Sequence, residues 1–280
     1  MKKFLWIITP IVLLVVVCTV CHAAPLGNKE TEQIVTKEIP VPDFDAVNAS
    51  RAVKVILTAQ GDKIRIDADE NLMAWVVVEP EDDELQVTID RQIKSINNSH
   101  VTVTIPVQGR TFRSLRASSA AEIRGKEVEL KGADLLVKAS SAAKIETSVK
   151  AGSCSIDASS AADIDLTVKA ATCNIEASSA ANVRADIQSE SCTADASSAA
   201  GITLKGITEY FESGNSSAGK VNASELTAQR ADVTASSGSK TSVNCTKSLK
   251  ASASSGAGIR YTGDCQVEAS KSSGGSIRRK

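Results

Sequence analysis

A five-residue stretch that returns at a nearly constant spacing constrains the fold of this chain more than any other feature. Ala-Ser-Ser-Ala-Ala first occupies 117–121 and recurs at 139–143, 158–162, 177–181 and 196–200. Looser copies follow at 215–219, 235–239, 253–257 and 271–275. The first serines of successive copies lie 18 to 22 residues apart, and the commonest step is 19. Such a period over more than half of a chain predicts a solenoid of stacked coils.

Apolar residues also recur at fixed distances from the first serine of each copy, and they form three columns. The position five residues after the serine holds Ile123, Ile145, Ile164, Val183, Ile202, Val221, Thr241, Ile259 and Ile277. The position five residues before it holds Leu135, Cys154, Cys173, Cys192, Phe211, Ala231, Leu249 and Val267. The position nine or ten residues after it holds Val128, Val149, Val168, Ile187, Ile207, Leu226 and Cys245.

Charged and polar residues separate these columns, so each coil consists of short strands with one inward and one outward face. Such a coil buries its inner face only when neighbouring coils stack and pair in parallel. The period is too long for the hexapeptide left-handed helix, and the leucine-rich consensus is absent. We therefore predict an all-β protein, a right-handed parallel β-helix with coils of about 19 residues. The serine-rich stretch should form a tight corner whose hydroxyls bond to backbone groups.

Opposite charges are expected to face one another on neighbouring coils. The same outward positions hold Arg124 and Glu146, Asp165 and Arg184, and Lys144 and Asp163. Opposite charges on adjacent strands add about 0.2–1 kcal/mol a pair, so they should support the register of the stack.

The N-terminus predicts export. Residues 1–23 combine two lysines, an apolar run and a terminal small residue, which is typical of a secretory signal peptide. A membrane anchor is the alternative, but the run is short for a spanning helix and Pro10 interrupts it. A lipid anchor is a further alternative, although Cys18 and Cys21 each follow a valine rather than a small residue. Residues 24–37 are polar without a period and predict a flexible leader.

The rest of the chain divides into two parts. Residues 38–110 alternate apolar and polar residues and predict a strand-rich N-terminal part of the β-helix, with one short helical turn within 69–75. Residues 111–280 predict the repeat β-helix of about nine coils.

The cysteines Cys154, Cys173 and Cys192 follow one another at the repeat spacing, which invites a metal-binding or redox hypothesis. Their column also holds leucine and phenylalanine, so we expect them to pack as small buried hydrophobes. Their Cβ atoms would be about 4.8 Å apart, which is wider than the ~3.8 Å of a relaxed disulfide. No histidine is near enough to complete a zinc site. Cys245 and Cys265 lie about one coil apart, and an exported compartment would permit a disulfide between them.

Three acids, Asp157, Glu176 and Asp195, stand two residues before the first serine of successive coils. Stacked like charges destabilise a sheet, so a bound cation is conceivable. The alternative is a solvated file of carboxylates with Lys138 on the preceding coil. The serines lack an adjacent base, because His100, the one histidine after residue 23, lies outside the repeats. We therefore predict no catalytic, cofactor-binding or metal-binding residue.

Composition also argues against two classes of partner. A formal net charge of −1 indicates no strong preference for nucleic acid or an anionic membrane. Aromatic residues make up 3% of the chain, too few for a repeated platform on which bases or sugar rings could stack.

The chain resembles the family described as putative autotransporter adhesin, head GIN domain, which is common in exported proteins of Bacteroides and relatives. The resemblance covers about residues 38–280. It rests on Pro42-Asp-Phe-Asp-Ala-Val, Val53-Lys-Val-Ile-Leu, Gly61-Asp-Lys-Ile-Arg-Ile, Val101-Thr-Val-Thr-Ile-Pro, Ser255-Gly-Ala-Gly-Ile-Arg-Tyr-Thr-Gly-Asp and Ser273-Gly-Gly-Ser-Ile. Relatives typically carry Gly-Ser-Gly or Gly-Ala-Gly at each corner, whereas most corners here read Ser-Ser-Ala. The resemblance implies a β-helical fold and an adhesive role, and it names no ligand or catalytic residue.

We therefore expect an exported, non-enzymatic adhesion or interaction protein in the periplasm or on the cell surface of a Gram-negative bacterium. Its rigid β-helical surface would contact a surface protein or a glycan, without a cofactor, nucleic acid or an integral membrane span after signal cleavage. A polysaccharide-acting enzyme is the alternative, but it needs carboxylates clustered at about 5–10 Å on a groove, and the coils are uniform. A purely structural envelope protein is the other alternative. The oligomeric state, and whether Cys245 and Cys265 pair, stay open.

Overall fold

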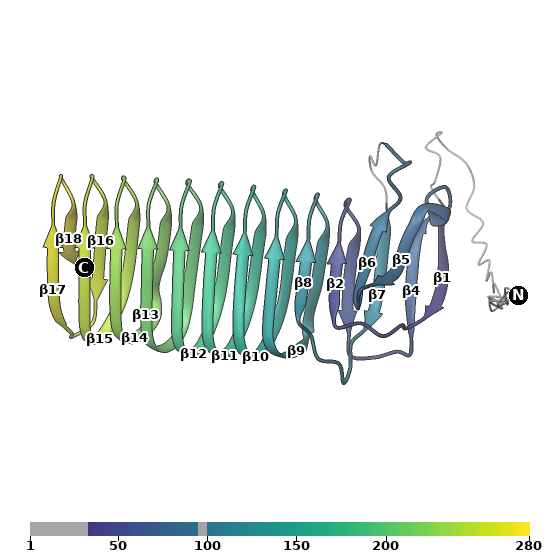
Figure 1. The fold of residues 1–280 in the computed structure, drawn as a ribbon, viewed down its shortest axis with the longest axis horizontal. Coiled ribbons are helices and arrows are strands. Elements are labelled where there is room, and N and C mark those ends of the chain that lie inside the picture. The colour runs from purple at the N-terminus through teal and green to yellow at the C-terminus, as the bar shows by residue number, and fades with distance from the viewer. Residues whose placement is uncertain (1–32, 95–99) are drawn as a thin grey trace, which may run out of the picture.

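The computed structural model describes residues 33–94 and 100–280, which wind into a parallel solenoid (Figure 1). The 18 strands belong to one sheet and stack along the long axis of the molecule. This confirms the predicted all-β fold, a parallel β-helix with coils of about 19 residues. The predicted signal peptide, residues 1–23, lies outside the described residues. Within the described ranges, no helix is long and apolar enough to cross a membrane.

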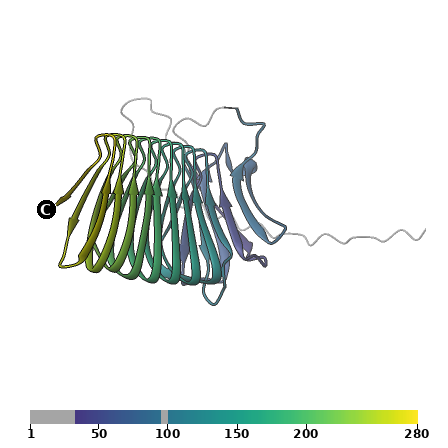
Figure 2. The same cartoon turned by 60° about the vertical axis from the view of Figure 1, so that its left-hand side comes forward.

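Seven long strands form the regular part of the repeat, and each winds through most of one coil. They are β9 (Glu122–Ala139), β10 (Lys144–Ala158), β11 (Asp163–Ala177), β12 (Asn182–Ala196), β13 (Gly201–Asn215), β14 (Lys220–Ala235) and β15 (Lys240–Ala253). The shorter strands β16 (Gly258–Thr262), β17 (Gln266–Lys271) and β18 (Ser276–Arg279) complete the stack. Equivalent positions face one another on parallel neighbours, as Ile145 faces Ile164, and Figure 2 shows the coils stacked in this way.

The first of these coils is longer than the others because β9 contains a bulge. Thr147 of β10 lies opposite Gly125, whereas the next residue, Ser148, lies opposite Glu129. Residues 126–128 therefore have no counterpart on β10, and they account for the 22-residue first step of the repeat. On both sides of the bulge β9 and β10 stay paired, and further register shifts occur between β13 and β14 and between β14 and β15.

The predicted inward columns form the core. The column that begins with Ile123 is at most 8% exposed along its full length. Cys154, Cys173, Cys192 and Phe211 are fully buried in the second column. Because regular coils contribute the same positions, a side chain buried in one of these columns packs between equivalent ones on the coils above and below it.

Two residues assigned to these columns, Ile207 and Val267, are exposed. The assignment of Ile207 is wrong, whereas Val267 lies opposite Leu249 and so does belong to its column. Val128 and Cys245 are buried but out of register, because Leu130 lies opposite Val149 and Ala228 lies opposite Cys245. Gly206, not Ile207, lies opposite Ile187, and Ile207 is 56% exposed. Gly206 has φ +108°, and a Cβ there would lie 2.1 Å from the Ile187 carbonyl oxygen, so the backbone turns in a way that glycine permits. Val267 is 37% exposed because β17 pairs with β15 on one side, and no described strand covers its other side.

Each serine-rich corner is a type I′ β-turn. In the first one, Ser119 and Ala120 have φ of 51° and 61°, and the Ala121 amide donates to the Ser118 carbonyl at 3.1 Å. The Ala120 amide donates to the Ser141 carbonyl of the next corner at 2.9 Å, and the same bond links the corners that follow. The predicted tight corner is therefore present. The predicted role of the hydroxyls holds at one corner, where Ser239 Oγ accepts from the Ser236 amide and donates to the Asn215 carbonyl, each at 3.1 Å. Between the corners, backbone carbonyls accept the bonds instead.

The outward charges have the predicted register but different partners. Glu146 lies opposite Arg124, yet its Oε1 is 2.6 Å from Lys126 Nζ, and this contact lowers the pKa of Glu146. Arg124 instead pairs with Glu122 of its own strand at 2.6 Å. Long side chains reach diagonal neighbours as easily as direct ones, so register alone did not determine the ion pairs.

Eight strands and one short helix precede the repeat. They are β1 (Ile34–Pro40), β2 (Ala46–Ala49), β3 (Lys54–Thr58), β4 (Lys63–Asp69), η1 (Met73–Trp75), β5 (Val76–Glu81), β6 (Glu84–Ile89), β7 (Val101–Pro106) and β8 (Ser114–Ala117). Antiparallel pairing of β4 with β1 and β7, and of β5 with β6, closes this end of the solenoid. The short 3₁₀ helix η1 lies within the range for which one helical turn is predicted.

Residues 46–58 form a coil that is stacked out of chain order, which their sequence does not indicate. Strand β2 pairs in parallel with β6 and β8, and β3 pairs in parallel with β7 and β9. The connection between them contains Arg51 and Ala52, whose φ of 61° and 59° match the central corner residues. The Ala52 amide donates to the Ser119 carbonyl at 2.9 Å, which joins this corner to the ladder of the others.

The flexible leader predicted for residues 24–37 is wrong at its C-terminal end, because β1 begins at Ile34 and pairs with β4. Only Val35 and Ile39 of this strand are half-buried, and the rest of it is exposed. Backbone pairing with β4 therefore holds β1 in place. Because so little of the strand is buried, its sequence lacks the clear apolar alternation by which a strand is predicted.

Aromatic packing fixes the segment between β1 and β2. The rings of Phe44 and Phe112 meet edge to face with centroids 6.1 Å apart, and Arg110 lies over Phe44 at 4.4 Å. The same guanidinium donates to the Phe44 and Pro42 carbonyls at 3.2 and 2.9 Å. This contact ties residues 42–44 to the start of the repeat and so positions the N-terminal strands.

Candidate functional site

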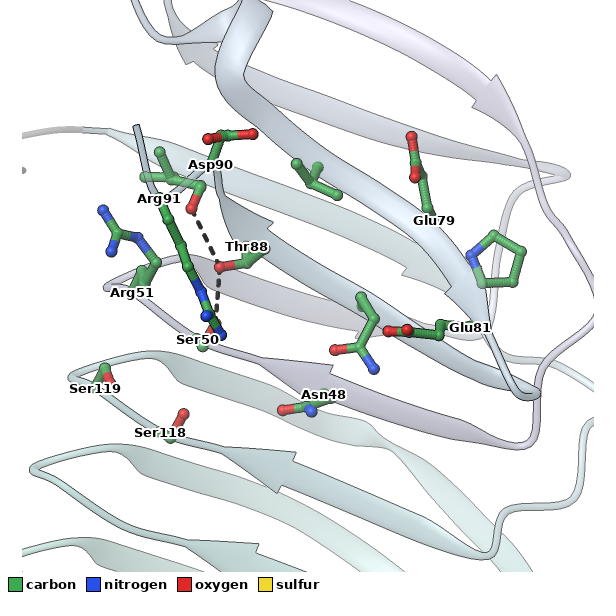
Figure 3. A pocket seen from close by; sticks show the side chains of 14 residues that line it. Asn48, Ser50, Arg51, Glu79, Glu81, Thr88, Asp90, Arg91, Ser118 and Ser119 are labelled. Carbon is green, nitrogen blue, oxygen red and sulfur yellow. Dashed lines mark hydrogen bonds between the residues drawn. The ribbon is translucent and has the colours of Figure 1, made fainter. Parts of the chain in front are cut away.

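The N-terminal end contains a cleft of about 790 Å³, at the place where the solenoid stops being uniform (Figure 3). Strand β6 should lead into a four-residue corner, but eleven residues separate it from β7. Strand β5 and the start of this connection form one wall, and the corners at Ser50 and Ser118 form the other. The labelled lining residues are Asn48, Ser50, Arg51, Glu79, Glu81, Thr88, Asp90, Arg91, Ser118 and Ser119.

Hydroxyl groups line the base of the cleft. Ser50 Oγ donates to Thr88 Oγ1 at 2.8 Å across neighbouring coils (Figure 3). The side-chain amides of Asn48 and Gln86 already donate hydrogen bonds within the cleft wall, to Glu84 Oε2 at 3.3 and 2.9 Å. Arg116 also lies 3.5 Å from the other Glu84 oxygen, so Glu84 is neutralised within the wall. The fixed part of the cleft is therefore polar and internally bonded.

Arg51 has an unusual place in the cleft. It occupies the corner position that holds serine in the regular coils, and its positive φ is that of the turn. Its Nη2 donates to the Ile93 carbonyl, which fixes the guanidinium beside the connection that follows β6. Its Nε is buried, and no described residue accepts a hydrogen bond from it. Arg51 thus has a fixed position and an uncommitted donor.

The other charges of the cleft are free to bind. Glu79 and Glu81 alternate along β5 and are exposed, and Arg91 is exposed on the connection. Among residues 33–94 and 100–280, none of the three has an oppositely charged atom within 4.0 Å. A polar cleft that contains both guanidinium donors and carboxylate acceptors suits a ligand with several hydrogen-bonding groups. The described part of the chain contains no group of three His, Cys, Asp or Glu side chains that could hold a metal ion.

The predicted acidic file is present and lies away from this cleft. Asp157, Glu176 and Asp195 face one another on β10, β11 and β12, beside a hollow of about 270 Å³. Lys138 Nζ lies 3.2 Å from Asp157, and the Gly214 amide donates to Asp195 Oδ1 at 2.5 Å. Both ends of the file are therefore compensated by the protein, which weakens the case for a cation.

The predicted cysteine column packs as small hydrophobes. Cys154, Cys173 and Cys192 are in register and fully buried. A hydrogen bond with Cys173, together with burial, raises the pKa of Cys154 far above its ordinary value. A neutral buried thiol is a poor nucleophile and a poor metal ligand, so this column serves the core.

Cys245 and Cys265 are close to each other, although they are not in register. Cys245 is buried and its thiol donates to the Ser248 carbonyl at 3.0 Å. Cys265 lies in the connection between β16 and β17, packs partly against the core and contacts the Cys245 thiol. Both are free thiols in this structure.

Partial exposure should make Cys265 the cysteine of the described repeat that reacts first with iodoacetamide. Burial, and then the Cys245 thiol, raise its pKa above the ordinary 9.0, so the thiolate forms late. We expect its alkylation rate to rise between pH 8 and pH 10 and still to be rising where a free cysteine has levelled off. Peptide mass spectrometry after timed alkylation checks this. Equal early labelling of Cys173 would contradict it.

Serine and histidine chemistry finds no support in the geometry. His100 lies before β7, and its ring Nδ1 is 3.8 Å from Asp69 Oδ1, while its amide donates to Asp69 Oδ2 at 2.7 Å. It is thus part of the N-terminal strands and outside the repeats, as the sequence indicates. The corner serines form an exposed turn, and no described histidine is beside them.

The cleft residues were missed because they look ordinary in the sequence. One signal could have found Arg51: Ala49-Ser50-Arg51-Ala52 follows the corner pattern with arginine in place of the second serine. Glu79, Glu81 and Arg91 have no such signal. They reach the cleft because β2 and β3 insert between the coil of β6 and β7 and the coil of β8 and β9.

Comparisons with known proteins place the chain among adhesin-like solenoids. A family model described as "Putative auto-transporter adhesin, head GIN domain" matches residues 43–186 and 164–265. A crystal structure of a putative adhesin from Parabacteroides merdae is similar with a TM-score of 0.68 and 18% identity, covering 89% of this chain and 97% of that chain. A putative adhesin from Parabacteroides distasonis gives 0.67 and 17%, covering 89% and 98%.

A third solved structure carries a different description. A putative lipid binding protein from Parabacteroides distasonis is similar with a TM-score of 0.60 and 17% identity, covering 89% of this chain and 98% of that chain. At these identities the likeness shows the shared fold. No curated protein matches the chain by sequence.

Proposed function

Because the chain belongs to the family described as "Putative auto-transporter adhesin, head GIN domain", we propose that it is an exported, non-enzymatic adhesion protein. Its contact site is the N-terminal cleft, and its ligand is a polar group of a surface protein or a glycan. The predicted signal peptide at residues 1–23 and the adhesin family both support export.

One observation supports this proposal. The cleft lies where the long connection between β6 and β7 interrupts the regular coils, and it contains charged side chains of both signs that have no ionic partner in the described chain. Glu79, Glu81 and Arg91 lack an ionic partner in the described chain, and Arg51 keeps a buried donor free. Hydrogen bonds to charged groups contribute about 1.5–3 kcal/mol each, so a few of them can hold a polar ligand. The rigid solenoid would hold these groups at fixed positions, which lowers the entropic cost of binding.

Removing the three exposed charges should weaken adhesion. We expect the variant Glu79→Gln/Glu81→Gln/Arg91→Gln to bind its ligand at least about tenfold less tightly, because charge-assisted hydrogen bonds are lost. The wild type is screened against glycan arrays and matrix proteins, and each hit is titrated with the variant. The matched control is Glu127→Gln/Glu209→Gln/Lys131→Gln, three exposed charges on the regular coils.

Two results would count against the proposal. If the cleft variant binds every hit as tightly as the wild type, the cleft is not the contact site. If the wild type releases reducing ends from a polysaccharide and the variant does not, the cleft belongs to an enzyme. Surface labelling of intact cells together with isolation of the periplasmic fraction tests export separately, since a protein retained in the cytoplasm would be neither labelled nor found in that fraction.

A further inference from the structure

One outward face of the solenoid changes its charge along the stack. The face consists of the positions four, six and eight residues after the first serine of each corner. In the first four coils it carries both signs, as in Glu122, Lys144 and Arg184. Several of these charges are paired across neighbouring coils, for example Arg184 with Asp163 at 4.0 Å and Lys126 with Glu146 at 2.6 Å. With four cations and five carboxylates, this part of the face has a net charge of −1.

The last four coils carry cations alone on the same face. They are Lys220, Lys240, Arg260, Arg278 and Lys280, and all five are exposed. The other positions of this face hold neutral polar or small residues, such as Asn222, Ser242 and Ser276. Lys220 lies directly opposite Lys240, and Arg260 lies directly opposite Arg278.

This arrangement is unfavourable unless something neutralises it, because like charges directly opposite on neighbouring strands repel. Within residues 33–94 and 100–280, no carboxylate oxygen lies within 4.0 Å of these five cations. Arg279, on the other face of β18, shows the contrast, since it pairs with Asp264. The repulsion therefore persists in the free protein and would be relieved by an anionic ligand.

The cations surround two adjoining hollows of about 350 and 260 Å³. Lys220, Ser242 and Arg260 line both, so the hollows form one continuous surface that we call the cationic groove. It crosses four coils, or roughly 14 Å at about 4.8 Å per coil. Hydroxyl groups of Ser242 and Ser276 add neutral donors and acceptors between the charges.

We propose that the cationic groove binds an acidic polysaccharide that lies along the solenoid axis. The inference rests on the proposed adhesion function and gives it a ligand class at a second site. A linear polymer with repeated carboxylate or sulfate groups matches a row of cations repeated from coil to coil, and its hydroxyls match the serine and asparagine side chains.

Two other anionic partners fit the groove less well. Single-stranded nucleic acid is held by several stacked aromatic rings, and the groove contains one, Tyr261. An anionic membrane would call for apolar side chains that insert among lipids. The large apolar side chains exposed in the described chain are Ile34, Ile207 and Val267, and none of them lines the groove.

The test measures binding of the purified protein to polygalacturonate and heparin, with dextran as the neutral polymer. We expect binding to both acidic polymers, none to dextran, and a steep loss with added NaCl because exposed charges are screened. The variant Lys220→Gln/Lys240→Gln/Arg260→Gln/Arg278→Gln should bind on the order of 100-fold less tightly, since four exposed ion pairs are lost. The control Lys37→Gln/Lys131→Gln/Lys150→Gln/Arg230→Gln removes as many exposed cations from other faces and should bind as the wild type does.

The remaining outcomes overturn the inference. They are a wild type that ignores both acidic polymers, a groove variant that binds as tightly as the wild type, and a control variant that is weakened equally. Equal or tighter binding of oligo-dT or of phosphatidylglycerol vesicles, lost in the groove variant, would replace the polysaccharide with those ligands. The cleft variant Glu79→Gln/Glu81→Gln/Arg91→Gln is titrated in the same assay, and a loss of binding in this variant alone identifies the N-terminal cleft as the site. A negative result at the groove therefore leaves the proposed adhesion function standing.

Discussion

Replacing Phe211 by alanine is expected to lower the free energy of unfolding by about 3–5 kcal/mol, the range for truncating a buried phenylalanine. Phe211 is fully buried, and its neighbours in the column are Cys192 on one coil and Ala231 on the other. Both neighbours are small, so they leave room for the ring and cannot fill the cavity that its removal creates. Denaturant titration of the two proteins measures the difference.

Val267 provides the matched control for Phe211, because it occupies the same column and is 37% exposed. Val267→Ala should cost less than about 1 kcal/mol, since little apolar area is lost from the core. A loss below 1 kcal/mol for Phe211→Ala would mean that the stack relaxes around the cavity. The packing of coil on coil described for the core would then be wrong at that position.

The second large effect is a stabilisation. Replacing alanine by glycine at six corners should raise the free energy of unfolding by about 3–6 kcal/mol in total. The residues are Ala120, Ala142, Ala161, Ala180, Ala199 and Ala218, each with φ near 61° at the second central position of a type I′ turn. A left-handed conformation costs an L-residue about 1–2 kcal/mol, and the greater freedom of glycine in the unfolded chain returns about 0.4–1 kcal/mol of this.

The chain itself supports this expectation, since the last three corners already carry Gly238, Gly256 and Gly274 with φ of 71°, 71° and 79°. The control moves the substitution by one residue, to the buried alanines Ala162 and Ala181, which have ordinary φ. Ala162→Gly/Ala181→Gly should destabilise the protein, whereas Ala161→Gly/Ala180→Gly should stabilise it. Denaturation midpoints that move in the same direction for both pairs would refute the explanation from turn strain.

The repeat could be predicted because its core positions are filled again and again under the same constraint. The inward residue is buried at Ile123 and at each later member of that column, and all members except Thr241 are Ile or Val, so one substitution hardly disturbs the pattern. Ile207 was wrongly placed in the core by its spacing. Gly206, with its positive φ, lies opposite Ile187 instead, so the Ile207 side chain is exposed. Spacing records which residues recur, but it does not record a local change in backbone direction.

The two surfaces that carry the proposals show why sites are harder to predict than coils. The cleft brings together residues 48–51, 77–91 and 118–119, which become neighbours only when β2 and β3 are inserted out of chain order. The cationic groove is hidden by a formal net charge of −1 for the whole chain, because acids elsewhere cancel its cations. Both surfaces depend on register between coils, which composition and motifs do not contain.

Because the regular coils repeat, their number sets the distance between the two proposed binding surfaces. The cleft lies before the regular coils and the cationic groove lies on the last four, so the coils between them set the separation. Deleting or duplicating one 19-residue unit would change that separation by a fixed increment, about 4.8 Å. A change in the number of units would thus alter the spacing of the targets that the protein can bridge, while each surface stays intact.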